Sequence, residues 1–205
     1  MIAREGWTRI AIFALLAFGV QVFAGTIWAL PLWLLLLLVI QFFRDPDREI
    51  PQQPGAIVSP AHGRVVAIEN VVDPYVERRA LKISIFMNVF DCHVNRTPCE
   101  GKISEILYKP GKFLNASLDK ASEDNERNYY KITNNHGEEI IVVQIAGLIA
   151  RRIVCESSKD QQLQQGERIG MIRFGSRADV YFENYETLVK VGQKTIAGET
   201  LLAKR

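Results

Sequence analysis

The chain has 205 residues, of which 48% are hydrophobic, and its formal net charge at pH 7 is only +2. This near balance of charge gives no global field that would attract a nucleic acid, so we expect no nucleic-acid partner. Once the apolar N-terminal stretch is set aside, roughly 160 residues remain, which is enough for one domain.

The first element in chain order is an apolar stretch, residues 10–43, which contains no charged side chain. A straight helix over this stretch would be about 51 Å long, well beyond the ~30 Å hydrocarbon core of a bilayer. Gly25 and Pro31 interrupt the stretch near its middle. We therefore expect residues 1–43 to form a membrane-inserted helical hairpin. Its two helices are expected near residues 8–24 and 29–43.

Arginines flank the apolar stretch: Arg4 and Arg9 precede it, and Arg44 and Arg48 follow it. By the positive-inside rule both ends lie on the cytoplasmic side, which predicts a location at the cell inner membrane with the following domain facing the cytoplasm. Each helix would reach about 25 Å or less, so a hairpin that just spans the bilayer and a re-entrant one both stay open. A cleaved signal peptide is disfavoured, because the stretch far exceeds a signal's apolar core.

The remaining residues, 44–205, begin with a polar, proline-containing segment and then show short runs rich in β-branched and apolar residues, separated by turn signals. This pattern is typical of a mainly β domain of the α+β class. The tail, residues 187–201, alternates and turns at Gly192 and Gly198, which resembles the hammerhead half of a barrel sandwich. One helix is expected at Ala146–Cys155, where apolar residues line one face. The expected strands are Ala56–Val58, Arg64–Val72, Leu81–Met87, Lys102–Tyr108, Tyr129–Thr133, Glu139–Ile145 and Gly170–Phe174.

Short motifs that combine polar residues with glycine or proline lie along this domain. In chain order they are Ser59-Pro60-Ala61-His62-Gly63, Phe86-Met87-Asn88-Val89-Phe90-Asp91-Cys92-His93-Val94-Asn95-Arg96, Pro110-Gly111-Lys112-Phe113, Asp124-Asn125-Glu126-Arg127, Gln144-Ile145-Ala146-Gly147 running into Ala150-Arg151-Arg152-Ile153, and Arg173-Phe174-Gly175-Ser176-Arg177. In this order and at this spacing they closely resemble the short, membrane-bound phosphatidylserine decarboxylase family. The resemblance covers nearly all of residues 44–205.

The Gly175-Ser176 pair carries the most specific implication. Taken alone, such a pair predicts a turn before a strand, because glycine readily takes positive φ and serine hydrogen-bonds its own backbone. The resemblance implies in addition that the precursor cuts itself between Gly175 and Ser176. The Ser176 hydroxyl would attack the Gly175 carbonyl to give an ester, and elimination and hydrolysis would then convert Ser176 into a covalent pyruvoyl group. The resemblance further implies that the mature enzyme decarboxylates phosphatidylserine to phosphatidylethanolamine and carbon dioxide.

Decarboxylation of an α-amino acid needs an electron sink conjugated to the amine, a role that proteins usually give to pyridoxal phosphate. The sequence shows no phosphate cup with a Schiff-base lysine, and Gly63, Gly101 and Gly111 do not make a nucleotide-binding loop. A ketone made from the chain itself would meet the same need. The three cysteines and three histidines match no metal-ligand spacing, so we expect reduced thiols and no metal.

His93 is the strongest candidate for acid–base work. Without the resemblance, a histidine that is hydrogen-bonded to the backbone in the core or a turn would be the more frequent case. The resemblance implies that His93 belongs to the self-processing triad that activates Ser176, and that it lies at the substrate's carboxylate in the mature enzyme. An imidazole titrates near neutral pH, which suits proton transfer in both directions.

His62 is the position at which the sequence departs from the family, whose motif reads Ser-Pro-Ala-Asp-Gly. In a triad the carboxylate orients the imidazole and stabilises the imidazolium, whereas a histidine at position 62 supplies no negative charge. Two explanations stay open: a natural variant compensated by Asp91, or a substitution that traps the uncut precursor. We favour the second, and therefore expect a processing-impaired, uncleaved proenzyme.

Cationic side chains are candidates for binding the lipid's phosphate and carboxylate, because arginine forms bidentate bonds to both groups. Arg151 and Arg152 follow the Gln-Ile-Ala-Gly motif and match the family's pattern. For Lys112, Lys120 and Arg127, a solvated surface position is about equally expected. The implied partners are a phospholipid substrate and the bilayer, with a homodimer as a further expectation because the family often forms dimers.

Two rival functions stay open at this level. An archaeal-type ether lipid with the same serine headgroup would satisfy the same motifs, because these motifs concern the headgroup and not the tails. A non-catalytic, membrane-tethered adaptor is the rival from another class, and His62 is the sequence feature that favours it.

Overall fold

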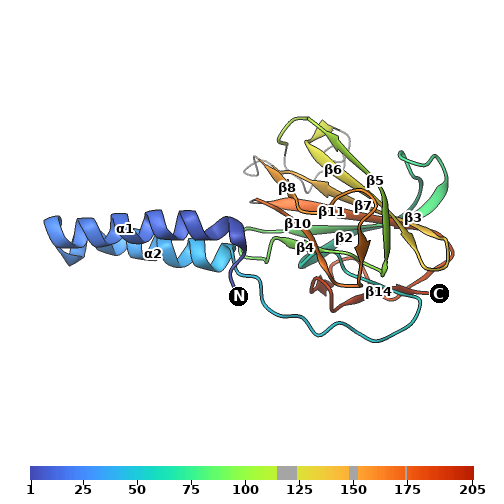
Figure 1. The fold of residues 1–205 in the computed structure, drawn as a ribbon, viewed down its shortest axis with the longest axis horizontal. Helices are drawn as coiled ribbons and strands as arrows, with labels where there is room; N and C mark the ends of the chain where they lie inside the picture. The colour runs from blue at the N-terminus through green and yellow to red at the C-terminus, as the bar shows by residue number, and fades with distance from the viewer. Residues whose placement is uncertain (115–123, 148–151, 174) are drawn as a thin grey trace. The chain divides into compact units, whose positions relative to one another are not determined.

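The computed structural model describes residues 1–114, 124–147, 152–173 and 175–205. The chain divides into two compact units, Met1–Asp47 and Arg48–Arg205 (Figure 1).

The N-terminal unit is a pair of antiparallel helices, α1 (Trp7–Ala24) and α2 (Thr26–Phe42), preceded by one 3-10 turn at Arg4–Gly6. Gly25 is the sole residue between the helices and has a φ of 92°, which explains why the reversal requires glycine. The expected helical hairpin is confirmed, but α2 begins three residues before its predicted start. Pro31 lies inside α2 instead of ahead of it, because Gly25 alone makes the reversal; the helix accommodates the hydrogen bond and the steric fit that an interior proline costs.

Small residues bring the two helices together. Ala17 and Ala29 are fully buried, and Trp33 Nε1 of α2 donates a hydrogen bond of 2.8 Å to Gln21 Oε1 of α1. The outward surface is apolar: Phe23, for example, is 92% exposed. Among the described residues, one helix, Arg4–Ala24, is long and apolar enough to cross a membrane by length and composition, and Thr26–Phe42 is a shorter apolar helix.

The second unit is built from antiparallel strands (Figure 1). An eight-stranded curled sheet has the order β13-β2-β3-β11-β7-β6-β5-β9, and two three-stranded sheets have the orders β1-β14-β12 and β4-β10-β8. The mainly β class with an N-terminal helical pair is thereby confirmed. The strands are β1 Ala56–Val58, β2 Gly63–Val72, β3 Arg79–Met87, β4 Val94–Arg96, β5 Gly101–Lys109, β6 Arg127–Asn134, β7 Glu139–Ile145, β8 Ile153–Cys155, β9 Gln162–Leu163, β10 Arg168–Ile172, β11 Ser176–Phe182, β12 Glu186–Thr187, β13 Lys194–Thr195 and β14 Leu201–Lys204.

The expected strands are found, two of them with the predicted bounds (β1 and β7) and the others shifted at their ends. The helix expected at Ala146–Cys155 is wrong, because Ile153–Cys155 form β8 and pair with β10. The β-branched Ile153 and Val154 suit a strand, and pairing with β10 outweighs the helical spacing of the apolar residues. Residues 148–151 of that expected helix lie outside the described residues.

Strand β11 is central in the large sheet, and its side chains alternate between the two faces of the sheet. Ala178, Val180 and Phe182 join the main core, which lies inside the curl of the sheet. The alternate residues Arg177 and Asp179 are buried on the outer face, where Arg177 Nε lies 2.6 Å from Asp179 Oδ1. Ser84 Oγ of β3 accepts a further hydrogen bond of 2.7 Å from Arg177.

Removing one partner of this buried ion pair should destabilise the domain strongly. We expect Asp179→Ala to lower the free energy of unfolding by about 3–5 kcal/mol, because it leaves the buried Arg177 guanidinium without its carboxylate. The exposed pair of Glu186 with Lys204, at 3.8 Å, provides the control: Glu186→Ala should cost about 0–1 kcal/mol. Chemical denaturation in detergent, followed by the tyrosine near-UV circular dichroism, measures both; equal costs would contradict the expectation.

Candidate active site

Ser176 is the first residue of β11 and is fully buried. It pairs in register with Met87 of β3, and its Oγ lies 3.9 Å from Met87 Sδ. The preceding Gly175 has a φ of 55°, a left-handed conformation that favours glycine. The bond between the two residues therefore leads from a bend at Gly175 directly into a buried strand.

The backbone of His93 lies beside the segment that precedes Gly175, because His93 directly precedes β4 and β4 pairs with β10. Its carbonyl accepts a hydrogen bond of 3.2 Å from the Ile172 N–H, three residues before Gly175. The side chain is fully buried, and Nδ1 lies 2.9 Å from the Asp91 carbonyl oxygen. Because a carbonyl only accepts, Nδ1 carries the proton of the neutral ring and the lone pair is on Nε2. The neutral imidazole is thus held in the tautomer that can accept a proton at Nε2.

A buried network of polar side chains lies behind Met87. Asn95 Nδ2 contacts Met87 Sδ at 3.7 Å, and Gln144 Nε2 donates to Asn95 Oδ1 at 2.8 Å. The Tyr130 hydroxyl is 3.1 Å from Gln144 Oε1 and 2.9 Å from the Ile169 carbonyl. Asn95, Gln144 and Tyr130 are fully buried, so these bonds fix the side chains next to the Ser176 contact.

Sequence reasoning assigned no role to Asn95, Gln144 or Tyr130, although the first two lie within the motifs. The signal was present in β7, where Gln144 is the one amide in the run Ile140–Ile145. A buried amide needs hydrogen-bonding partners, so its place in an apolar strand indicates a polar network.

His62 lies in a loop that meets the Asn88–His93 loop. His62 Nε2 is 3.7 Å from Asp91 Oδ1, and the Pro60 carbonyl accepts a hydrogen bond of 3.0 Å from the Arg96 N–H. Gly63 has no room for a side chain, because an added Cβ would lie 2.1 Å from the Phe86 carbonyl oxygen. The first two motifs are therefore in direct contact, and glycine at position 63 permits that contact.

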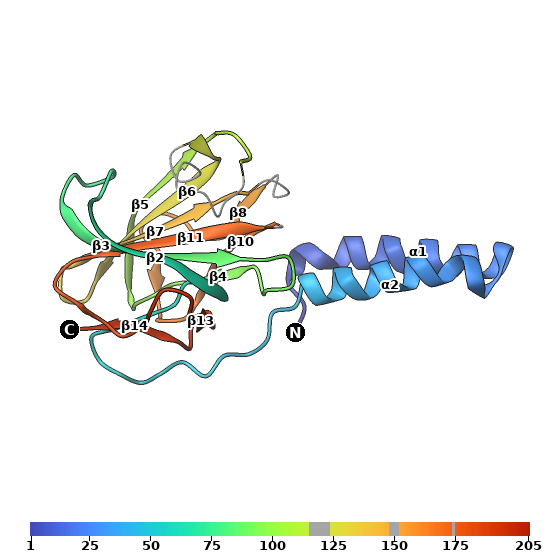
Figure 2. The ribbon, with the colours of Figure 1, turned by 180° about the vertical axis from the view of Figure 1, so that it is seen from behind.

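Asn125 joins three further motif segments. Its Nδ2 donates to the Leu114 carbonyl at 2.8 Å and to the Ala146 carbonyl at 2.7 Å. The neighbouring Glu126 Oε1 accepts a hydrogen bond of 3.2 Å from the Ile153 N–H. Segments that are far apart in sequence thus meet beside β8 and β10, at the end of the sheet opposite the β2–β3 turn (Figure 2).

A family model described as phosphatidylserine decarboxylase matches residues 35–203. A phosphatidylserine decarboxylase proenzyme of Pelagibacter ubique is 70% identical over 205 residues, which cover 98% of this chain and 95% of that protein. Proteins of the same name from Nitrosomonas eutropha and Burkholderia lata are 55% and 52% identical, with 100% of this chain and 95% and 96% of those proteins covered. The chain belongs to the phosphatidylserine decarboxylase family. This membership confirms the enzyme class expected from the motifs, a lyase of the decarboxylase type.

The structure separates the cationic candidates of this family member. The Arg152 carbonyl accepts a hydrogen bond of 3.3 Å from the Arg173 N–H, which places the Arg152 backbone beside the segment that leads to Gly175. Its side chain is exposed. Its charge acts near Tyr108, whose phenol has a pKa raised first by desolvation and then by the Glu126 carboxylate, with Arg152 opposing the shift.

The other candidates lie elsewhere or outside the described residues. Arg127 is in register with Ile145, and Ile145 with Arg177, so Arg127 lies on the outer face of the sheet, opposite the Ser176 side chain. Lys112 is exposed and its Nζ lies 3.4 Å from Asp124 Oδ2. Arg151 and Lys120 fall outside the described residues.

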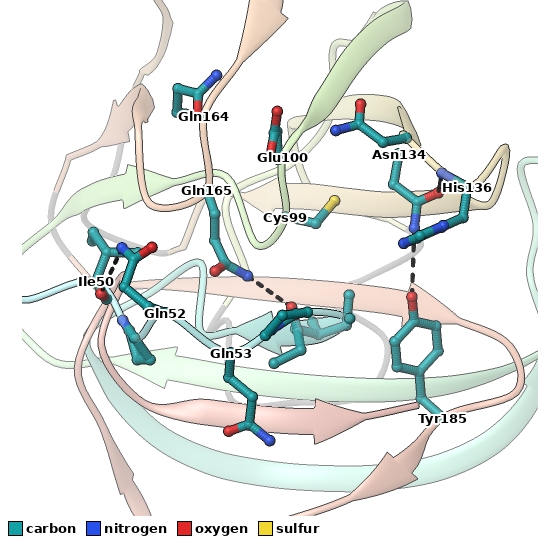
Figure 3. Close-up of a pocket in the computed structure, with 16 residues that line it drawn as sticks. Ile50, Gln52, Gln53, Cys99, Glu100, Asn134, His136, Gln164, Gln165 and Tyr185 are labelled. Carbon is teal, nitrogen blue, oxygen red and sulfur yellow. Dashed lines mark hydrogen bonds between the residues drawn. The ribbon is translucent and has the colours of Figure 1, made fainter.

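A cavity of about 480 Å³ lies between the segment 50–57 and the ends of β5 and β6 (Figure 3). Asn134 and Tyr185 face each other there across a hydrogen bond of 3.5 Å, and His136 is at the rim (Figure 3). Burial raises the pKa of the Cys99 thiol to about 12, which makes this cysteine unreactive near neutral pH. The described lining residues include none of the residues around Ser176, and His136 keeps no predicted role.

Proposed function

We propose that this chain is a precursor that cuts itself between Gly175 and Ser176 and then decarboxylates phosphatidylserine to phosphatidylethanolamine and carbon dioxide. The observation that carries the proposal is the family match over residues 35–203, combined with a buried Ser176 directly after a left-handed Gly175. The family match also favours the enzyme over the adaptor.

The proposed cleavage and conversion of Ser176 need no reactant other than water. His93 takes the proton of the Ser176 hydroxyl, and Oγ attacks the Gly175 carbonyl carbon. The peptide C–N bond breaks, which gives an ester and frees the amine of residue 176. Loss of the Ser176 α-proton then expels the Gly175 carboxylate and leaves dehydroalanine. Water then hydrolyses the dehydroalanine to the pyruvoyl ketone and releases its amine as ammonia. One water is consumed and one ammonia is released for each chain.

The surroundings of Ser176 fit the pyruvoyl group that this sequence of steps would make. A pyruvoyl group has fewer heavy atoms than a serine residue, so it fits in the space beside Met87 that Ser176 fills. When formed, it supplies the electron sink for loss of carbon dioxide. The cut would also separate Gly175 from β11. In the uncut chain residue 176 is fully buried, so this separation would give the substrate's amine access to it.

His93 and Arg152 are the described residues that we propose for the substrate. The His93 imidazole would lie at the serine carboxylate and return a proton to the α-carbon after carbon dioxide leaves. Arg152, with Arg151, would bind the phosphate, for which the planar guanidinium is suited. The proximity of Arg152 to the segment before Gly175 supports this role.

Release of labelled carbon dioxide from carboxyl-labelled phosphatidylserine tests the proposed activity. The assay uses a purified chain that has been cut, with the uncut chain as its control. A parallel arm with an ether-linked lipid that carries the same serine headgroup measures the tail preference. Release that does not depend on the cut would contradict the proposal.

We further propose that residues 1–43 insert into the inner membrane as a hairpin and hold the catalytic domain on its cytoplasmic face. The apolar outward surfaces of α1 and α2 and the flanking arginines support this arrangement. Such anchoring would keep the active-site mouth at the headgroup layer while the acyl chains of the substrate remain in the lipid.

Deleting residues 1–43 should lower activity on bilayer phosphatidylserine much more than activity on a short-chain, water-soluble phosphatidylserine. The physical reason is that the anchor concentrates the domain at the headgroups and takes no part in the chemistry. The ratio of the two activities, measured in the His62→Asp background, checks this. Equal losses on both substrates would mean that the segment serves folding alone. Protection of the domain from protease in inside-out vesicles would reverse the proposed orientation.

A further inference from the structure

Asp91 has a carboxylate close to His62, the residue at which this chain departs from its family. Residues 59–63 and 86–96 form the two contacting motifs, and Asp91 is their only acidic residue. Its Oδ1 lies 3.7 Å from His62 Nε2, with 18% of the Asp91 side chain and 28% of the His62 side chain exposed. The two side chains form a partly buried pair in which the acid and the imidazole are close enough for an ion pair.

The Asp91 carboxylate is held in place by its own loop. Its Oδ2 accepts a hydrogen bond of 2.9 Å from the Asn88 N–H, and the Asp91 N–H donates to the Asn88 carbonyl at 3.0 Å. Asn88 Oδ1 in turn accepts a hydrogen bond of 2.8 Å from the Phe90 N–H. One carboxylate oxygen thus fixes the loop while the other faces His62.

Asp91 also holds the catalytic imidazole through its backbone. The Asp91 carbonyl accepts the hydrogen bond from His93 Nδ1 at 2.9 Å. A triad carboxylate performs two tasks, because it orients the imidazole and stabilises the positive charge that forms on it. Asp91 performs the first task through its carbonyl, and its carboxylate, which belongs to the same loop as His93, is the acid that the inference assigns to the second.

We propose that Asp91 is the positioning residue that supplies the triad's carboxylate in this chain, with His62 as its partner. The carboxylate that the family motif has at position 62 is thus supplied from position 91, and its Oδ1 lies 3.7 Å from His62 Nε2. This inference rests on the proposed self-cleavage. According to this inference, Asp91 and His62 are responsible for the slow cleavage that remains when position 62 lacks a carboxylate.

The test is a cycle of four full-length chains: the chain as written, Asp91→Asn, His62→Asp, and His62→Asp combined with Asp91→Asn. Asparagine has the size of aspartate and keeps an oxygen for the Asn88 N–H, so the loop contact is retained while the charge is lost. Each chain is made by cell-free synthesis into detergent micelles. Intact mass against time then gives the rate of cleavage at Gly175.

We expect Asp91→Asn to slow cleavage of the chain with His62 by about tenfold, less than the ~10⁴-fold that loss of the carboxylate costs in a serine-protease triad. In the His62→Asp background the same change should leave the rate unaltered, because position 62 then carries the carboxylate. A merely structural role would not produce this dependence on the background.

Three results would overturn the inference: equal slowing in both backgrounds, no slowing in either, or complete absence of cleavage in the chain as written while His62→Asp is cut. The first would reduce Asp91 to a loop contact. If neither background is cut at Gly175, the proposed self-cleavage itself has failed, and the inference falls with it.

Discussion

Replacing Ser176 by alanine should leave a single uncut polypeptide that contains no pyruvoyl group and releases no carbon dioxide. Alanine removes the oxygen that we propose attacks the Gly175 carbonyl, and with it the proposed source of the ketone. The fold should persist, because Ser176 is fully buried with a weak contact of 3.9 Å to Met87 Sδ, and alanine leaves no unsatisfied polar group there. Intact mass and carbon dioxide release measure the effect in the His62→Asp background, where we expect cleavage to be fast.

Ser104→Ala is the matched control for Ser176→Ala. Ser104 is a partly buried serine of β5, and its hydroxyl donates a hydrogen bond of 3.1 Å to the Lys131 carbonyl. This control should be cut and active. Release of carbon dioxide by the Ser176→Ala chain would show that the electron sink comes from elsewhere.

Changing His62 to aspartate should accelerate cleavage by several orders of magnitude. The unmodified chain is expected to remain mostly uncut during purification, because position 62 lacks the carboxylate that the family motif places there for the triad histidine. A comparable loss in a serine-protease triad costs ~10⁴ in rate. The rate is followed by intact mass, and the new carbonyl is detected with hydroxylamine, or with borohydride in the presence of phosphatidylserine.

His136→Asp provides the same chemical change at an exposed hairpin tip. It should leave cleavage as slow as in the chain as written. A chain that is already fully cut with His62 in place, or a His62→Asp chain that is no faster, would contradict the expectation about position 62.

The helical pair and the longer strands follow from the sequence because hydrophobic pattern alone decides them. The uncharged apolar residues on both sides of Gly25 leave few alternatives to two packed helices. The β-branched run Glu139–Ile145 likewise predicts a buried strand, and β7 has the same bounds.

The burial of both faces of β11 was not predicted, and the reason is physical. Arg177 and Asp179 alternate with Ala178 and Val180, which is the pattern of a strand with one polar face. In the structure both faces are buried, because Arg177 and Asp179 neutralise each other. The ion pair between Arg177 and Asp179 cannot be recognised from composition, because an arginine and an aspartate in most strands lie on a solvated surface.

The sequence proposes residues for the site but says nothing of how they are connected. Motif resemblance pointed to Ser176, His93 and His62 without any distance between them. The contact of His62 with Asp91 depends on how two loops meet, and the link from Asn95 to Gln144 depends on the positions of β4 and β7. Such contacts join residues that are far apart in the chain, so local sequence patterns carry no information about them.

The mass of the small fragment from the His62→Asp chain is the decisive measurement. Self-cleavage with conversion of Ser176 predicts a fragment covering residues 176–205 that is lighter, by one ammonia, than the same fragment with an ordinary N-terminal serine. It also predicts a large fragment that ends in the Gly175 carboxylate. A small fragment with a free N-terminal serine, a cut at another bond, or a chain that stays whole would contradict the proposed origin of the pyruvoyl group.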